Sequence, residues 1–203
     1  MGITEILGIA ASLSLLAGWR LYLTILATGA AMHFGWLPLP DHLAALQVLA
    51  EPWVLGVAAI GTLAEFFADK IAWVDSAWDA IHSFVRPLGG ALLALALVDA
   101  SDPTWQVVAF LLGGGGALLS HGAKATTRAV VNVSPEPFSN VAVSAGEDIA
   151  TGGLLALAIA FPALAIGIAI LLAVAALAVI WALGKLLRRI RSALSPDAAT
   201  PPV

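Results

Sequence analysis

The stretch Ala163–Leu183, ALAIGIAILLAVAALAVIWAL, decides the fold class because it contains no charged residue over its whole length. A helix needs about 20 mostly apolar residues to cross the hydrocarbon core of a bilayer. This stretch meets that requirement without interruption, and a basic cluster follows it, made of Lys185, Arg188, Arg189 and Arg191. Such a cluster at the end of an apolar segment is typical of a spanning helix that ends in the cytoplasm.

The composition of the whole 203-residue chain extends this interpretation. Hydrophobic residues make up 61% of the chain, charged residues 11%, and the mean hydropathy is +0.98. A soluble domain has roughly 45–50% apolar and about 25% charged residues. The formal net charge of −4 gives no basic surface for nucleic acid. The absence of cysteine excludes disulfides and thiolate metal sites. We therefore predict an integral membrane protein whose partner is the lipid bilayer, with no nucleic-acid partner.

The remaining apolar segments predict an all-α fold with about six transmembrane helices. They are Ile6–Phe34, Pro52–Ala68, Pro87–Val98, Thr104–Leu119 and Ile149–Phe161. The first is too long and carries Arg20, so we expect it to be tilted or broken near Gly18. The third and fifth are too short alone, so we expect the polar stretches before them to enter the membrane as amphipathic or partly re-entrant elbows. Residues 1–192 then form one polytopic domain, 193–203 a disordered cytoplasmic tail, and 41–50 a short surface helix.

The basic residues predict the orientation of the chain. The links near 35–51 and 99–103 contain no lysine or arginine, whereas basic residues gather in 70–86, 124–128 and 185–191. Because basic residues favour the cytoplasmic side, we expect both termini in the cytoplasm.

Two segments, 52–98 and 103–161, share one plan and predict an internal repeat. Each begins with a proline close to a tryptophan and continues through an apolar segment and a polar elbow. Each then has a Gly-Gly pair, Gly89-Gly90 or Gly152-Gly153, before a short apolar helix. In the six-span arrangement the two halves are related by an axis along the membrane normal, and repeats of this kind place functional sites between the halves.

Polar residues recur at helical spacing beside these apolar segments. The stripes are Glu65 and Asp69; Asp75, Asp79, His82 and Arg86; His121, Lys124, Arg128 and Asn132; and Asn140, Ser144, Glu147 and Thr151. A charge deep in hydrocarbon costs upwards of about 2.5–3.5 kcal/mol. Two interpretations stay open: the stripes converge on a membrane-embedded polar cavity, or they are solvated faces of cytoplasmic helices.

The candidate substrate- or ion-binding residues come from these stripes and their surroundings. They are Arg20, Glu65, Asp69, Asp75, Asp79, His82, Arg86, His121, Lys124, Arg128, Glu136, Asn140, Glu147 and Asp148. The signs of the charges predict ion pairs between the repeats, Glu65/Asp69 with Lys124/Arg128 and Arg86 with Glu147/Asp148. Two prolines flank Glu136 and must open the backbone there.

We expect the protein to be a small transporter or channel that moves a small ion or polar solute through a charged cavity between the repeats. The acidic residues and His82 would handle a cation or proton, and the basic residues would balance them or hold an anion. At 20.7 kDa a single chain has little room for a pathway, so we expect a homo-oligomer. No catalytic residue and no resident cofactor are predicted.

Two other functions stay open. The pairs Glu65-x-x-x-Asp69 and Asp75-x-x-x-Asp79 resemble the acidic motifs of intramembrane prenyltransferases, and carboxylates at this spacing can bind a divalent cation. These four residues are therefore metal-ligand candidates in an intramembrane lipid-modifying enzyme. The remaining possibility is a non-transporting membrane scaffold whose ion pairs only hold the helices together.

Three stretches of the chain also carry a family resemblance. They are Gly18-Trp19-Arg20-Leu21-Tyr22-Leu23-Thr24, the region from Glu65-Phe66-Phe67-Ala68-Asp69-Lys70 to Phe84-Val85-Arg86-Pro87, and the region from Ser134-Pro135-Glu136-Pro137 to Glu147-Asp148. Up to about Leu183 the chain resembles a family of bacterial integral membrane proteins classified as domain of unknown function 4126, which implies a location in the inner membrane of a bacterium. The resemblance implies no activity, but its motifs contain the candidate residues above.

Overall fold

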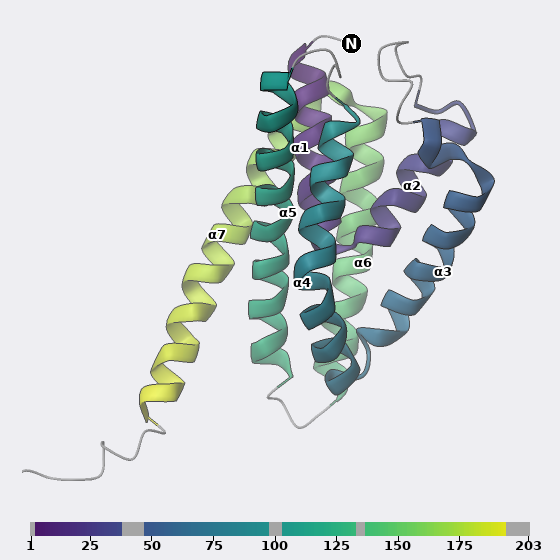
Figure 1. Ribbon diagram of the computed structural model, residues 1–203. Helices are drawn as coiled ribbons and strands as arrows, with labels where there is room; N and C mark the ends of the chain where they lie inside the picture. Colours follow the sequence, from purple (N-terminus) through teal and green to yellow (C-terminus); the bar gives the residue numbers. More distant parts are fainter. Residues whose placement is uncertain (1–2, 38–46, 98–102, 133–136, 194–203) are drawn as a thin grey trace, which may run out of the picture.

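The computed structural model describes residues 3–37, 47–97, 103–132 and 137–193, and these residues form helices joined by turns and loops, without a strand (Figure 1). The helices are α1 (Ile3–Trp19), α2 (Leu21–His33), α3 (Pro52–Ala68), α4 (Ala72–Leu95), α5 (Pro103–Val131), α6 (Pro137–Ala160) and α7 (Pro162–Ala193). Four of them begin with a proline, whose fixed φ suits the first helical turn and whose missing N–H is not needed there. The fold confirms the predicted all-α class.

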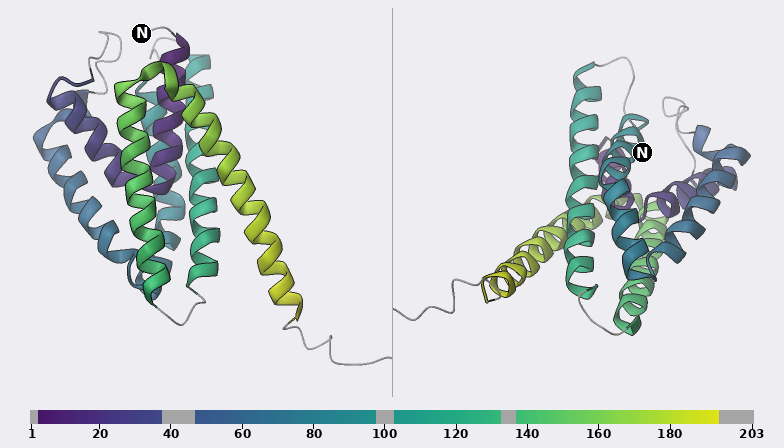
Figure 2. Two further views of the ribbon diagram at one scale, coloured as in Figure 1. Left: turned by 180° about the vertical axis from the view of Figure 1, so that it is seen from behind. Right: turned by 60° about the horizontal axis from the view of Figure 1, so that its bottom comes forward.

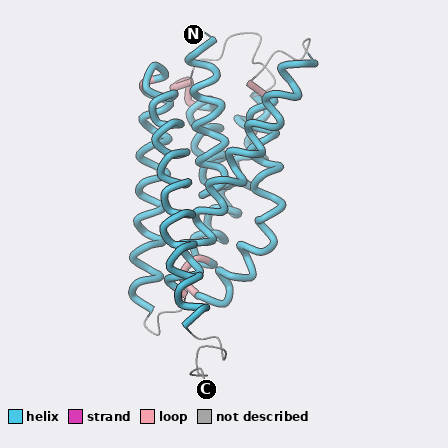
Figure 3. The backbone as a smooth tube through the Cα atoms, turned by 90° about the vertical axis from the view of Figure 1, so that its left-hand side faces the viewer, coloured by secondary structure: helices cyan, strands magenta, loops and turns pink. Residues whose placement is uncertain are grey.

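The first apolar segment is broken, as expected, but it folds back on itself. Arg20 separates α1 from α2 with φ −140° and ψ 81°, two residues after the predicted position. The two helices form a V whose open end lies beside the start of α1 and whose vertex lies part-way along the bundle (Figures 1 and 2). α1 therefore begins at one end of the bundle and α7 finishes at the other (Figure 3). The segment predicted as one long span is thus two shorter helices, and the six-span count is not confirmed.

The polar elbows are continuous with the apolar helices that they precede or follow. α4 runs through Pro87 without ending, and α5 and α6 likewise join a polar half to an apolar half. The predicted short spans are thus parts of longer helices. In both predicted repeats the first helix, α3 or α5, runs from the end of the bundle where α1 starts towards the other end (Figure 1). The second helix, α4 or α6, runs back, as a parallel duplication requires. Of the predicted surface helix, residues 41–46 lie outside the described residues, and 47–50 form a 3-10 turn.

The bundle core has two halves of opposite character. The half near the start of α1 is apolar and includes Leu13, Leu16, Leu155 and Ile168. Close helix contacts hold it together: a Cβ at Gly18 would overlap the Ala117 carbonyl oxygen of α5. The other half, near the 69–71 turn, contains the charged residues described below.

The helices expose apolar side chains and bury polar ones, the reverse of a soluble protein. On α4, Ile81 is 63% and Phe84 78% exposed, while Asp75 and Arg86 are both 0% exposed. Among the described residues, three helical segments are long and apolar enough to cross a membrane: Pro103–Val131, Phe138–Ala160 and Ala163–Ile190. Shorter apolar helices are Leu7–Trp19, Leu21–His33 and Pro52–Ala68.

Candidate functional site

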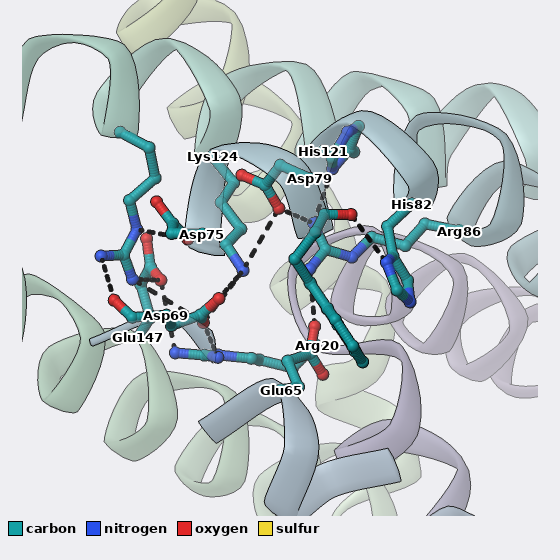
Figure 4. Close-up of polar contacts among 12 residues, drawn as sticks. Arg20, Glu65, Asp69, Asp75, Asp79, His82, Arg86, His121, Lys124 and Glu147 are labelled. Atoms are coloured by element: carbon teal, nitrogen blue, oxygen red, sulfur yellow. Dashed lines mark hydrogen bonds and ion pairs between the residues drawn. The ribbon is translucent and has the colours of Figure 1, made fainter. Parts of the chain in front are cut away.

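The three longer polar stripes and the end of α3 meet in one buried cluster, with Arg20 reaching it from the vertex of the V (Figure 4). The following residues of this cluster are each less than 10% exposed: Arg20, Glu65, Asp69, Asp75, Asp79, His82, Arg86, His121, Lys124, Arg128, Asn140 and Glu147. We call these residues and Asp148 the ion network. Their burial excludes the interpretation of the stripes as solvated cytoplasmic faces.

Asp69, just after α3, lies at the centre of the ion network. Its carboxylate accepts hydrogen bonds from Arg20 and from Lys124. Lys124 Nζ lies 3.1 Å from Asp69 Oδ2 and 3.2 Å from Oδ1. Arg128 Nη2 lies 3.8 Å from the same group, and its Nη1 donates to the Asp69 backbone carbonyl over 3.3 Å. One carboxylate thus balances basic side chains that come from the helix break and from α5.

Arg86 organises the part of the ion network between α3, α4 and α5. It donates to Glu65 over 2.6 Å, to Asp79 over 2.8 Å and to His121 Nδ1 over 2.7 Å. Because arginine only donates hydrogen bonds, His121 Nδ1 must be unprotonated, which makes this imidazole neutral. Its Nε2–H then donates to the Ser83 hydroxyl over 3.0 Å. Lys124 connects this part to Asp69, since its Nζ lies 3.7 Å from Asp79.

Arg128 and Arg20 connect α6 to the ion network. Arg128 donates to Glu147 over 2.8 Å and to the Asn140 side chain over 2.6 Å. Arg20 lies 3.1 Å from Asp148 and 3.4 Å from Glu147. The α6 carboxylates therefore pair with the helix-break arginine and with α5.

The predicted pairing between repeats is confirmed in one half and wrong in the other. Asp69 pairs with Lys124 and Arg128 as expected. Glu65 instead pairs with Arg86, and the α6 carboxylates pair with Arg20 and Arg128. Arg20, which belongs to neither repeat, pairs instead with the two α6 carboxylates that were predicted to pair with Arg86.

Two side chains at the edges complete the site. Tyr22, which the sequence analysis did not single out as a site residue, lies 3.2 Å from His82 Nε2, while His82 Nδ1 donates to the Trp78 carbonyl over 2.8 Å. The sequence signal for Tyr22 is its position two residues after Arg20, within a stretch that carries the family resemblance. In the 69–71 turn, partial burial lowers the pKa of the Lys70 amine, and the nearby Asp148 carboxylate acts in the opposite direction.

The ion network contains more acidic than basic groups. Its described ion pairs involve six carboxylates and four basic side chains: Glu65, Asp69, Asp75, Asp79, Glu147 and Asp148 against Arg20, Arg86, Lys124 and Arg128. With all six carboxylates ionised and Lys70 at its edge included, the formal charge of the network is −1. Within the described residues, several buried polar atoms have no hydrogen-bond partner, among them Glu65 Oε2, Asp75 Oδ1 and the Nε atoms of the three arginines.

The four metal-ligand candidates do not form a metal site. Glu65, Asp69 and Asp79 pair directly with basic side chains, and Asp75 accepts from the Asn132 amide. No group of three or more His, Asp or Glu side chains in the described part of the chain is arranged to hold a metal ion. The paired-acid enzyme hypothesis gains no geometric support from this arrangement. Glu136 lies outside the described residues, so its predicted role stays a prediction.

The fold and site define a helical bundle with a buried ion network and an apolar exterior. Residues 7–182 match the family described as Domain of unknown function (DUF4126), and the chain belongs to this family, as the motifs predicted. Searches of curated proteins and of solved structures give no match.

Proposed function

We propose that the protein is a small membrane carrier that moves protons or another small cation through the ion network. The observation that carries this proposal is the excess of buried carboxylates over basic side chains. A buried charge without a partner costs several kcal/mol in a low-dielectric interior. The ion network therefore favours the uptake of one more positive charge, which is what a cation carrier needs at its binding site.

The outward-facing apolar side chains support a membrane position for the bundle. Helices of 17 residues such as α3 extend about 26 Å, and α4 to α7 are longer, which suits a hydrocarbon core of about 30 Å. α3 to α7 would each cross the bilayer, and the V of α1 and α2 would enter and leave on one side. With the basic end of α7 in the cytoplasm, as its charge favours, the α1 start would lie outside; this proposal differs from the expectation of two cytoplasmic termini.

The division of the core supports a carrier with a closed outer half. The apolar cluster around Leu13, Leu16 and Leu155 separates the ion network from the proposed outer side. A cavity of about 400 Å³ in this half is lined almost wholly by apolar residues of α1, α5 and α7, such as Leu7, Leu112 and Ile170. Its lining offers nothing for a polar solute, so the charged half is the better candidate for the binding site.

Flux into liposomes tests the proposal. Purified protein is reconstituted into vesicles that contain a pH-sensitive dye, and a potassium diffusion potential drives proton entry, with sodium and rubidium uptake measured separately. We expect the wild type to exceed protein-free vesicles for at least one of these cations. Asp79→Asn, which removes the charge shared by Arg86 and Lys124, should lower that flux at least tenfold.

Glu51→Gln is the matched control, because Glu51 is exposed and lies before α3, away from the ion network. It should retain the wild-type rate. Wild-type vesicles that match empty vesicles for all three cations would refute the carrier and favour the scaffold. Lipid turnover that depends on a divalent metal would favour the enzyme instead.

A further inference from the structure

Asp75 is the least compensated of the fully buried carboxylates. Its side chain is 0% exposed, yet among the described residues it accepts from one side-chain donor, Asn132 Nδ2, over 3.1 Å. Arg128 Nε, the nearest basic atom in the described part of the chain, lies 4.0 Å from Asp75 Oδ1, and neither atom has a hydrogen-bond partner there. A buried carboxylate normally accepts several hydrogen bonds or contacts a cation directly. Asp75 does neither with its second oxygen.

The other carboxylates of the ion network are better matched. Asp69, also 0% exposed, contacts Arg20 and Lys124 directly, and Glu65 accepts from Arg86 over 2.6 Å. Asp148 is the second weakly compensated group, but 24% of its side chain is exposed, so water can solvate its charge. The excess negative charge of the ion network is therefore most costly at Asp75.

Asp75 also lies where a proton can reach it. It is in the first turn of α4, close to the 69–71 turn that ends the charged half of the bundle. Asn132, its donor from α5, is half-buried, and the next residue on α4, Ser76, is exposed. The charged groups that face Asp75 are Arg128 from α5, Asp79 from α4 itself and Asp69 from the turn after α3, with Glu147 of α6 behind Arg128.

We propose that Asp75 is the proton-binding carboxyl of the carrier, so that the proton is a transported or coupling ion; this rests on the proposed function. Water at the Asn132 edge supplies the proton, which binds an Asp75 oxygen and turns the carboxylate into a neutral acid. Asp75 then no longer attracts Arg128, which keeps its hydrogen bonds to Glu147 and Asn140. Because Arg128 also lies 3.8 Å from Asp69, the protonation of Asp75 changes the charge balance at the centre of the ion network.

Infrared difference spectroscopy tests this assignment directly. A protonated carboxyl has a C=O stretch at higher frequency than any carboxylate band, so protein in lipid membranes is compared between neutral and mildly acidic buffer. We expect the wild type to gain one such band on acidification. The band should be absent from Asp75→Asn, whose amide keeps the shape of the acid, and present in Asp148→Asn and in the exposed control Glu51→Gln.

A band that persists in Asp75→Asn, or a wild type that gains none, would overturn the assignment. If Asp75→Asn does not fold, Asp75→Glu serves instead: a shift of the band supports Asp75 as its source, and an unchanged band overturns it. Flux measured on the same preparations separates the two proposals. An Asp75 band without wild-type flux refutes the carrier and leaves the proton site, whereas flux that Asp75→Asn does not change refutes only the proton site.

Discussion

Replacement of Asp69 by asparagine tests whether the ion network is energetically one unit. The carboxylate faces Lys124 at 3.1 Å and Arg128 at 3.8 Å, in addition to its contact with Arg20. At an effective dielectric constant of about 20, each of the two measured separations corresponds to about 4–5 kcal/mol of Coulomb attraction. Desolvation offsets much of this, and removal of one partner from a buried pair costs about 3–5 kcal/mol net. We expect Asp69→Asn to lower the free energy of unfolding by this amount.

Reversible unfolding in mixed detergent micelles, followed by tryptophan fluorescence, measures the change. The double variant Asp69→Asn/Lys124→Met removes one charge of each sign, so it should be more stable than the sum of the single changes predicts, by about 0.5–3 kcal/mol. Glu51→Gln should unfold like the wild type. A loss below about 1 kcal/mol for Asp69→Asn, or additive effects in the double variant, would refute the view that these charges depend on one another.

Three further predictions concern the packing and geometry of the site. Gly18→Ala should destabilise the protein by about 1–3 kcal/mol, because the new Cβ overlaps α5, whereas Gly115→Ala, with open space around it, should be neutral or stabilising in the same unfolding assay. Arg86→Lys keeps the charge but cannot reproduce the guanidinium fork that contacts two carboxylates, so cation flux should fall at least tenfold. Arg188→Lys, at an exposed position of α7, should leave the flux unchanged. Tyr22→Phe removes a hydrogen bond to the α4 imidazole and should lower stability by about 0.5–1.5 kcal/mol, and an unchanged unfolding midpoint would contradict that role.

Periodicity identified which side chains face inwards, because that depends on one helix at a time. Residues 75, 79, 82 and 86 share a face of any regular helix, and the structure buries all four. The pairing of their charges depends on how separate helices approach one another, which periodicity does not encode. Arg20 shows this most clearly. The sequence predicted that the segment around this arginine is tilted or broken, but not how it folds back: the Arg20 N–H donates to the Leu16 carbonyl of α1, and the Arg20 carbonyl accepts from Thr24 of α2.

The ion network contains more charged groups than the association of its helices requires. In the apolar half, α1 is held to its neighbours by hydrogen bonds from Ser12 and Ser14 to the backbone carbonyls of Ala165 and Gly90, and by direct helix contact at Gly18. Apolar residues of similar size in place of a buried ion pair are often neutral or stabilising. A scaffold could therefore hold these helices together at lower cost without a network that contains more carboxylates than basic side chains. The excess has a physical use where a positive charge must enter and leave, and this favours a carrier over a scaffold.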